Sequence, residues 1–192
     1  MAKLSRRTTT STSDGESRVV RTSGEIFADG SVIELVSSAI DNQLDVLFWH
    51  KHRKTIAPQI EYRDRVYQAP DLDETLRRAI RFPSDADDYG TTRKFFAQIR
   101  ILFERYIGLA PAEAALLTAW TCSTWFADGV SSPPTLVVSG PDMGPAITLF
   151  RLLSCLCRRS LVLADINRAG FLSLAPLHPT LLIMSVIEGK LS

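Results

Sequence analysis

The sequence predicts an α/β protein, α+β over the whole chain, in which a small antiparallel β region and a helical segment precede a partial parallel sheet with helices. Three observations predict this class. Short strand-like runs between turn residues fill positions 25–70, apolar residues recur at helical spacing over 71–130, and short apolar runs alternate with helix-length segments in 131–192. The 192 residues allow one medium domain or two small ones with a substantial core.

Positions 1–24 are rich in serine and threonine and contain almost no large apolar residue. Such a composition cannot drive burial, so it predicts a disordered tail. An alternative is a weak phosphate-contacting or phosphorylatable arm, which we favour less because short basic and polar termini are common. The basic residues of such an arm would be Lys3, Arg6, Arg7, Arg18 and Arg21.

The segment 25–70 predicts a small antiparallel sheet, because strand-like runs alternate with turn signals there. The runs cover 31–36, 44–49, 56–62 and 65–67, and the turns fall at Asp29-Gly30, Asp41-Asn42 and Arg63-Asp64.

The densest positive cluster in the chain is the run Trp49-His-Lys-His-Arg-Lys54, between two predicted strands. An aromatic ring beside cationic side chains is a common way to hold single-stranded nucleic acid. The candidate contacts are Trp49, Lys51, Arg53 and Lys54. We favour a solvated hairpin turn whose charges protect the sheet edge. His50 and His52 would share one strand face, but the run offers no third ligand, so we expect no metal site.

The segment 71–130 predicts three helices, each from a start or stop signal. The first opens at a capping box with Asp71 as N-cap and ends at Pro83, the second covers 91–107 and is closed by Gly108, and the third runs from Pro111 to Asp128.

Tryptophans at helical spacing are more often core residues than a binding surface, so we expect Trp120 and Trp125 to be core residues. The cysteines, Cys122, Cys155 and Cys157, are odd in number and lack metal-ligand spacing. We therefore expect buried free thiols.

The run Thr135-Leu-Val-Val-Ser-Gly-Pro-Asp-Met-Gly-Pro-Ala-Ile-Thr148 has the layout of a phosphate-binding loop. A strand over 135–139, a glycine-containing turn and a helix over 146–159 reproduce the order of the motif G-x-x-x-x-G-K-[ST]. The residues that would line the loop are Gly140, Pro141, Gly144 and Thr148.

The groups that hold phosphate are missing from this loop. Counting from Gly140, Pro145 stands in place of the second glycine, Ala146 in place of the lysine, and Ile147 in place of the hydroxyl that binds magnesium. Proline has no N–H, alanine has no cation, and isoleucine cannot bind a hard metal ion. We therefore expect no cofactor.

P-loop enzymes also carry an acidic residue at the end of a neighbouring buried strand. The apolar run 179–183 predicts that strand, but Met184 and Ser185 follow it where an acidic pair is expected, and Glu188 lies beyond the strand end. Asp165, after the predicted strand 161–164, is interpreted as a helix N-cap.

These features resemble the front half of a P-loop ATPase core, of the kind found in bacterial primase-helicase-like and mobile-element proteins. The resemblance rests on Gly140-Pro141, the helix 149–159 and the strands 161–164 and 179–183, about a quarter of the chain. It implies a partial P-loop NTPase-like parallel sheet. Such families bind ATP through the loop lysine and hydrolyse it with the acidic pair; because both are absent, the resemblance implies the fold without the activity.

Only nine residues follow Ile183, whereas an ATPase core continues with further strands. We therefore expect a truncated core that leaves a sheet edge open to a protein partner or to self-association. With no apolar run near the ~20 residues that span a bilayer and no secretion signal, we expect a cytoplasmic protein without membrane contact.

Two hypotheses for the function follow. The preferred one is a non-catalytic P-loop NTPase-like scaffold for protein or nucleic-acid contacts. The alternative is an ATPase subunit of a DNA-processing assembly, completed by a partner chain, and only this alternative requires ATP and magnesium. Its substitute cations would be Arg151, Arg158 or Arg159, but the last two lie at the far end of the predicted helix from the loop.

Overall fold

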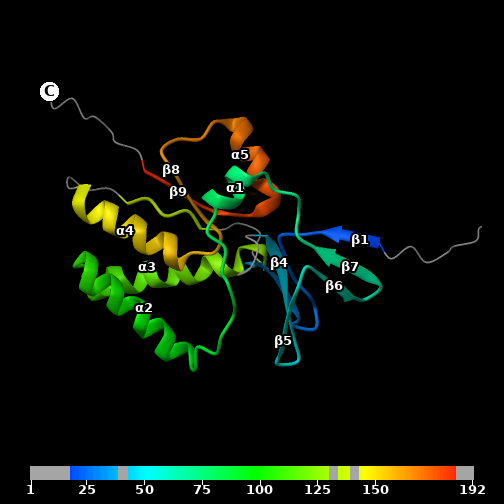
Figure 1. Cartoon of the computed structure of the whole chain (residues 1–192). Helices are drawn as coiled ribbons and strands as arrows, with labels where there is room; N and C mark the ends of the chain where they lie inside the picture. Colours follow the sequence, from blue (N-terminus) through cyan, green and yellow to red (C-terminus); the bar gives the residue numbers. More distant parts are fainter. Residues whose placement is uncertain (1–17, 39–42, 130–133, 139–142, 185–192) are drawn as a thin grey trace, which may run out of the picture.

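The computed structural model describes residues 18–38, 43–129, 134–138 and 143–184. It confirms the mixed α/β class, with a β-rich N-terminal part, central helices and a C-terminal part that combines helices with a short parallel sheet. Figure 1 shows the β-rich part on the right and the central helices on the left.

The β-rich part contains two sheets where a single antiparallel sheet was predicted. Its strands are β1 (Arg18–Arg21), β2 (Gly24–Ile26), β3 (Val32–Ser37), β4 (Leu44–His50), β5 (Arg53–Ala57), β6 (Gln59–Tyr62) and β7 (Arg65–Gln68). One sheet is antiparallel in the order β2-β3-β4-β5, and the other has the order β1-β7-β6. Pro58 interrupts the predicted strand 56–62, because proline has no N–H for a sheet ladder, and the chain passes there from one sheet to the other.

The predicted tail over positions 1–24 is wrong at its C-terminal end. β1 pairs in parallel with β7, with Arg18 opposite Arg65. Val20 packs against the core of this part, so a small apolar contribution makes a polar segment into an edge strand. Positions 1–17 lie outside the described residues, together with Lys3, Arg6 and Arg7 of the predicted arm. The predicted turn Asp41-Asn42 also lies outside them.

β3 is buried on both of its faces, so it can place a polar side chain inside the protein. Ile33 packs on one face into a core with Phe27, Val46, Ile60 and Tyr67. The next side chain along the strand, Glu34, is also buried, and it points to the opposite face because side chains alternate along a strand.

α1 (Glu74–Ala79) has its N-cap at Asp73 and not at the predicted Asp71. The Asp73 carboxylate accepts a hydrogen bond from the N–H of Leu76 at 3.0 Å. Asp71 instead forms an ion pair with Arg21 of β1, so a tertiary contact takes the residue that the capping-box pattern had assigned to the helix.

α1 also ends earlier than predicted, before Pro83 is reached. Ile80 is extended and buried, and the N–H of Arg81 donates to the carbonyl of Ser160 at 2.9 Å. The helix stops because the chain needs an extended backbone to place Ile80 in the core and to bond Ser160.

α2 (Thr92–Ile107) and α3 (Pro111–Ser123) agree with the predicted starts. Thr91 caps α2, and Gly108 closes it with a left-handed φ of 78°. The third predicted helix ends as an α-helix at Ser123, and the 3₁₀ helix η1 (Thr124–Gly129) continues it. The hydroxyl groups of Ser123 and Thr124 donate to backbone carbonyls one turn back, which accompanies this tightening.

The C-terminal part contains α4, β8, α5, η2 and β9, in that order. Their bounds are α4 (Met143–Leu156), β8 (Ser160–Leu163), α5 (Arg168–Leu174), η2 (Ala175–Leu177) and β9 (Thr180–Ile183). β8 and β9 pair in parallel, with Leu161 opposite Leu181. Asn167 caps α5, and not Asp165 as predicted; the Asp165 carboxylate accepts only from the adjacent N–H of Ile166.

α4 lies between α2 and α3 on one side and the parallel pair β8 and β9 on the other, as Figure 1 shows. Phe103 of α2, Leu117 of α3, Leu153 of α4 and Leu182 of β9 belong to one core cluster. A second cluster joins α1, β8 and α5 around Ile80, Leu161 and Leu174. No helix within the described ranges is both long and apolar enough to cross a membrane.

Candidate functional site

The residues predicted to line the phosphate loop do not form such a loop in the part that the structure describes. Gly140 and Pro141 lie outside the described residues. α4 begins at Met143, three residues before the predicted start, so Gly144 belongs to the first turn of the helix. The hydroxyl of Thr148 donates to the carbonyl of Gly144 at 3.3 Å, within the helix.

The strand predicted over 135–139 is absent from 135–138, the part of it that the structure describes. The carbonyl of Pro134 accepts a hydrogen bond from the indole N–H of Trp120 at 2.9 Å, so this segment is attached to α3. Val137 is 84% exposed, whereas a central strand of an ATPase sheet would be buried on both faces. The predicted third strand of the parallel sheet is therefore wrong for these residues.

The strand predicted to carry the acidic pair is confirmed as β9. The N–H of Met184 donates to the carbonyl of Leu163 at 3.0 Å, which continues the parallel pairing past the end of the strand. Ser185 and Glu188 lie outside the described residues. Met184 has no group that could replace a carboxylate.

The nucleic-acid candidates do lie together, on the β4–β5 hairpin. Trp49 is opposite Lys54 in the antiparallel register, and Lys51 and His52 form the turn with φ values of 47° and 63°. The two side chains Trp49 and Lys54 therefore share a face of the sheet. Lys51 and Arg53 are exposed.

One of these four residues is already used in the fold. The Lys54 ammonium donates to the Asp85 carboxylate at 2.6 Å and to the Ala86 carbonyl at 2.8 Å. It therefore fastens the segment between α1 and α2 to the hairpin. The hydrogen bond from Lys54, together with that from the N–H of Ala86, lowers the pKa of Asp85.

The predicted arrangement of the histidines is wrong, because His50 ends β4 whereas His52 lies in the turn. His50 Nδ1 lies 2.7 Å from the Ser31 hydroxyl, and its ring stacks on Phe48 at 5.7 Å between centroids. Within the described residues, no group of histidine, cysteine and acidic side chains is arranged to hold a metal ion.

A cavity of about 780 Å³ lies in the C-terminal part, and we call it the apolar pocket. Its walls come from the end of α3, from η1, from the 134–138 segment, from α4 and α5, and from the segment that leads through η2 into β9. They include Trp120, Leu136, Phe150, Phe171, Leu174 and Ile183. The described lining residues include no lysine, arginine, aspartate or glutamate. Among them, His178 is the one titratable side chain. This wall suits an apolar ligand and cannot neutralise a phosphate.

β9 runs along this pocket and presents a backbone edge to it. Thr180, Leu181, Leu182 and Ile183 all line the pocket, and within the described residues β8 is the only strand paired with β9. An unpaired strand edge offers N–H and C=O groups to an extended chain. Apolar walls and an open edge therefore occur side by side.

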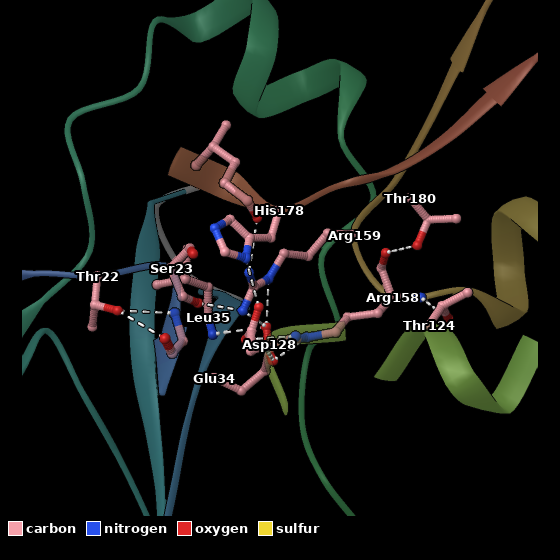
Figure 2. A network of polar contacts seen from close by, with 12 residues as sticks. Thr22, Ser23, Glu34, Leu35, Thr124, Asp128, Arg158, Arg159, His178 and Thr180 are labelled. Carbon is pink, nitrogen blue, oxygen red and sulfur yellow. Dashed lines mark hydrogen bonds and ion pairs between the residues drawn. The ribbon is translucent and has the colours of Figure 1, made fainter. Parts of the chain in front are cut away.

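A buried polar network connects the β-rich part to the C-terminal part, as Figure 2 shows. The side chains of Arg158 and Arg159 are 3% and 0% exposed. Both bind the Glu34 carboxylate of β3: the Nε of Arg158 donates to one oxygen at 2.6 Å, and the Nε of Arg159 donates to the other at 2.7 Å. Arg158 also pairs with Asp128 of η1 at 2.7 Å.

Backbone groups complete this network. The Nη1 of Arg159 donates to the Leu177 carbonyl at 2.8 Å, and its Nη2 donates to the Ser23 carbonyl. The His178 ring lies 2.9 Å from the Asp128 carboxylate. Burial lowers the pKa of Arg159, although the charge of Glu34 opposes this effect.

Arg158 and Arg159 are named above as substitute cations only for the ATPase alternative, and their distance from the loop already counts against that role. Both are enclosed and paired, which counts against it further. Two signals could have indicated the network. Glu34 is a charged residue inside an otherwise apolar strand, and the doublet Arg158-Arg159 separates an apolar helix from an apolar strand. Charges placed among core residues need partners.

The outcome for the other singled-out residues is mixed. Trp120 packs partly buried against the helical core, as predicted. Trp125 is 40% exposed, and its indole N–H donates to the Leu156 carbonyl at the end of α4. Of the cysteines predicted to be buried, Cys157 is buried, but Cys155 is exposed.

Comparison of the chain with protein-family models, with curated proteins and with solved structures gave no match.

Proposed function

We propose that this chain is a non-catalytic scaffold protein of the cytoplasm, which binds an extended apolar segment of a protein partner along β9. The observation that supports the proposal is the apolar pocket with the unpaired edge of β9 on its wall. Strand addition uses the backbone for affinity and the side-chain pockets for specificity. Free thiols, such as the three in this chain, are typical of a reducing compartment.

The absence of cations favours a protein partner over a nucleotide. The pocket wall has no lysine or arginine among its described residues. Ala146 and Ile147 stand where the loop lysine and hydroxyl would be. The ATPase alternative offers Arg151, Arg158 or Arg159 as substitute cations, and the last two are held by Glu34.

The proposal is tested by selecting displayed peptides on the native chain. We expect enrichment of extended sequences with alternating β-branched and aromatic residues. Phe171→Asp and Ile183→Asp place charges at exposed positions of the pocket, 54% and 44% exposed, and should abolish binding of the selected peptides. Leu116→Asp, at a 66% exposed site on α3 outside the pocket, is the matched control and should bind normally.

Other outcomes have defined meanings. Peptide binding that survives both pocket variants, or a selection without enrichment, contradicts the proposal. A dimer in sedimentation that dissociates in Ile183→Asp would identify the occupant as a second copy of the chain. Calorimetric titration with ATP and magnesium should give no binding heat with the native chain, and saturable binding would favour the ATPase alternative. The double variant Ala146→Lys/Ile147→Thr restores the loop cation and hydroxyl. It tests whether the loss of these two groups explains the absence of ATP binding.

A further inference from the structure

A second cavity, of about 610 Å³, borders β8, whereas the apolar pocket borders β9. It is lined by residues at the turn end of the β3–β4 hairpin, by the C-terminal end of α1, by the end of α4 and by β8. Three arginines line it: Arg77, Arg78 and Arg81. We call it the arginine cavity. Among its described lining residues there is no aspartate or glutamate.

Two of the three arginines have no ionic partner within the described residues. Arg78 pairs with Glu74 one turn earlier in α1, whereas Arg77 and Arg81 form no ion pair there. The Nε of Arg77 is shielded from solvent and has no hydrogen bond. A buried donor without a partner costs free energy, and native structures contain few of them. Among the described residues, the arginine cavity therefore has one unused buried donor, on Arg77, and no acidic lining residue to balance Arg77 and the exposed Arg81.

The other wall residues of the arginine cavity indicate the chemical character of a ligand that would fit. The hydroxyl groups of Ser37, Ser154 and Ser160 donate to backbone carbonyls, so the arginines are the side chains with donors to spare. The apolar wall residues include Leu44, Ile80, Phe82 and Val162. A cavity of this size accommodates a small organic molecule. Its walls suit a molecule with one strongly anionic group and an apolar body.

Arginine is the side chain best matched to a phosphoryl group, because its planar fork donates two parallel hydrogen bonds to two oxygens. Basic residues in the last turn of a helix also interact favourably with its carbonyl end, and Arg77 and Arg78 have that position in α1. That role does not account for Arg81, which follows the helix and is held against β8 by the hydrogen bond from its N–H to Ser160.

We propose that the arginine cavity binds the phosphoryl group of a small organic phosphate through Arg77 and Arg81. The site is separate from the segment that was predicted to form a phosphate loop. Ser154 of the cavity wall lies eleven residues along α4 from Met143, roughly 16 Å at the rise of an α-helix. The proposal is also independent of the partner segment proposed for β9.

Calorimetric titration of the full chain with inorganic pyrophosphate, at constant ionic strength, tests the site. We expect saturable binding that weakens by at least about tenfold in Arg77→Gln/Arg81→Gln, because two charge-assisted hydrogen-bond donors are lost. The control Arg93→Gln/Arg105→Gln removes the same charge from exposed positions on α2 and should keep the native affinity. Unfolding curves confirm that each variant is folded.

Three results would overturn the proposal: no saturable binding by the native chain, unchanged affinity in Arg77→Gln/Arg81→Gln, or an equal loss in the control. The source of the phosphoryl group is resolved by competition. A nucleoside monophosphate that displaces pyrophosphate more effectively than a single-stranded oligonucleotide identifies a small ligand. The reverse order, with loss of oligonucleotide binding in the same double variant, assigns the site to a nucleic-acid backbone.

Discussion

Glu34 of β3 accepts a hydrogen bond at 2.7 Å from Arg159, which lies 125 residues further along the chain. Arg159 is fully buried and has a left-handed φ of 47°, an uncommon conformation for a residue other than glycine. The backbone cost of that turn is offset by the contacts that the guanidinium makes with Glu34 and with two backbone carbonyls. We infer that the β-rich and C-terminal parts unfold as one cooperative unit.

Replacing Glu34 by Gln should destabilise the protein by about 3 to 5 kcal/mol, because it leaves two buried guanidinium groups without their shared counter-charge. The measurement is equilibrium unfolding in urea, followed by far-ultraviolet circular dichroism. Glu61→Gln, at an exposed position of β6, is the matched control and should change stability by less than about 0.5 kcal/mol. Equal stability of Glu34→Gln and the native chain would show that the network contributes little.

Gly24 is required by the same network, so Gly24→Ala should cost about 1 to 3 kcal/mol through overpacking. A Cβ on Gly24 would overlap Nη2 of Arg159 and would lie 2.6 Å from Nη2 of Arg158. These two Nη2 groups cannot move aside easily, because each is ion-paired with the Glu34 carboxylate, at 2.7 Å from Arg159 and 2.6 Å from Arg158. Gly129→Ala, whose nearest contact would be 3.8 Å away, is the control for the same unfolding experiment. A loss as large in that control would remove the steric explanation.

Local signals in the sequence predicted the helical segment well. Thr91 and Gly108 bound α2, and Pro111 begins α3, because each acts on its own backbone or on groups within one turn. The strands β8 and β9 were also predicted from apolar runs. The predicted N-cap at Asp71 is wrong because a long-range contact decides its role. Asp71 forms an ion pair with Arg21, which lies far away in the sequence.

The site could be predicted only in part. The pattern around Gly144 suggested a loop, but a helix starting at Met143 includes that glycine, and no periodicity in the sequence fixes where the first turn begins. The hairpin residues Trp49 and Lys54 were placed together correctly. The apolar pocket and the Arg158-Arg159 network depend on contacts between distant segments, which a single sequence does not specify.

Acid should weaken the protein partly through Asp128. Burial acts to raise the pKa of this carboxyl, but the charges of Arg158 and Arg159 and the hydrogen bond from His178 outweigh it, so the pKa lies below its ordinary value of 3.8. A lowered pKa in the folded state means that the unfolded state binds the proton more tightly. The stabilisation is therefore complete above the ordinary pKa and is lost as the pH falls through the lower, folded-state value.

Asp128→Asn should accordingly be less stable than the native chain near neutral pH, and the difference should shrink below about pH 4. Urea unfolding at a series of pH values measures it. Asp64→Asn, in the turn between β6 and β7 where asparagine also tolerates a positive φ, should follow the native curve. A stability difference for Asp128→Asn that does not vary with pH would mean that the charge of Asp128 is not what stabilises the fold.

The three cysteine thiols should react with a thiol reagent at very different rates, because they differ in burial. Measuring these rates tests which face of the end of α4 is exposed to solvent. Cys155 is exposed, whereas burial raises the pKa of Cys157 to about 12, and burial also raises the pKa of Cys122. Because the thiolate is the reactive form, we expect one fast reaction with Ellman's reagent in the native protein and three after unfolding. Cys155→Ser should remove the fast reaction and keep the slow ones. A fast thiol that persists in this variant would mean that Cys122 or Cys157 is accessible, and that the end of α4 does not pack against η1 and β9 as described.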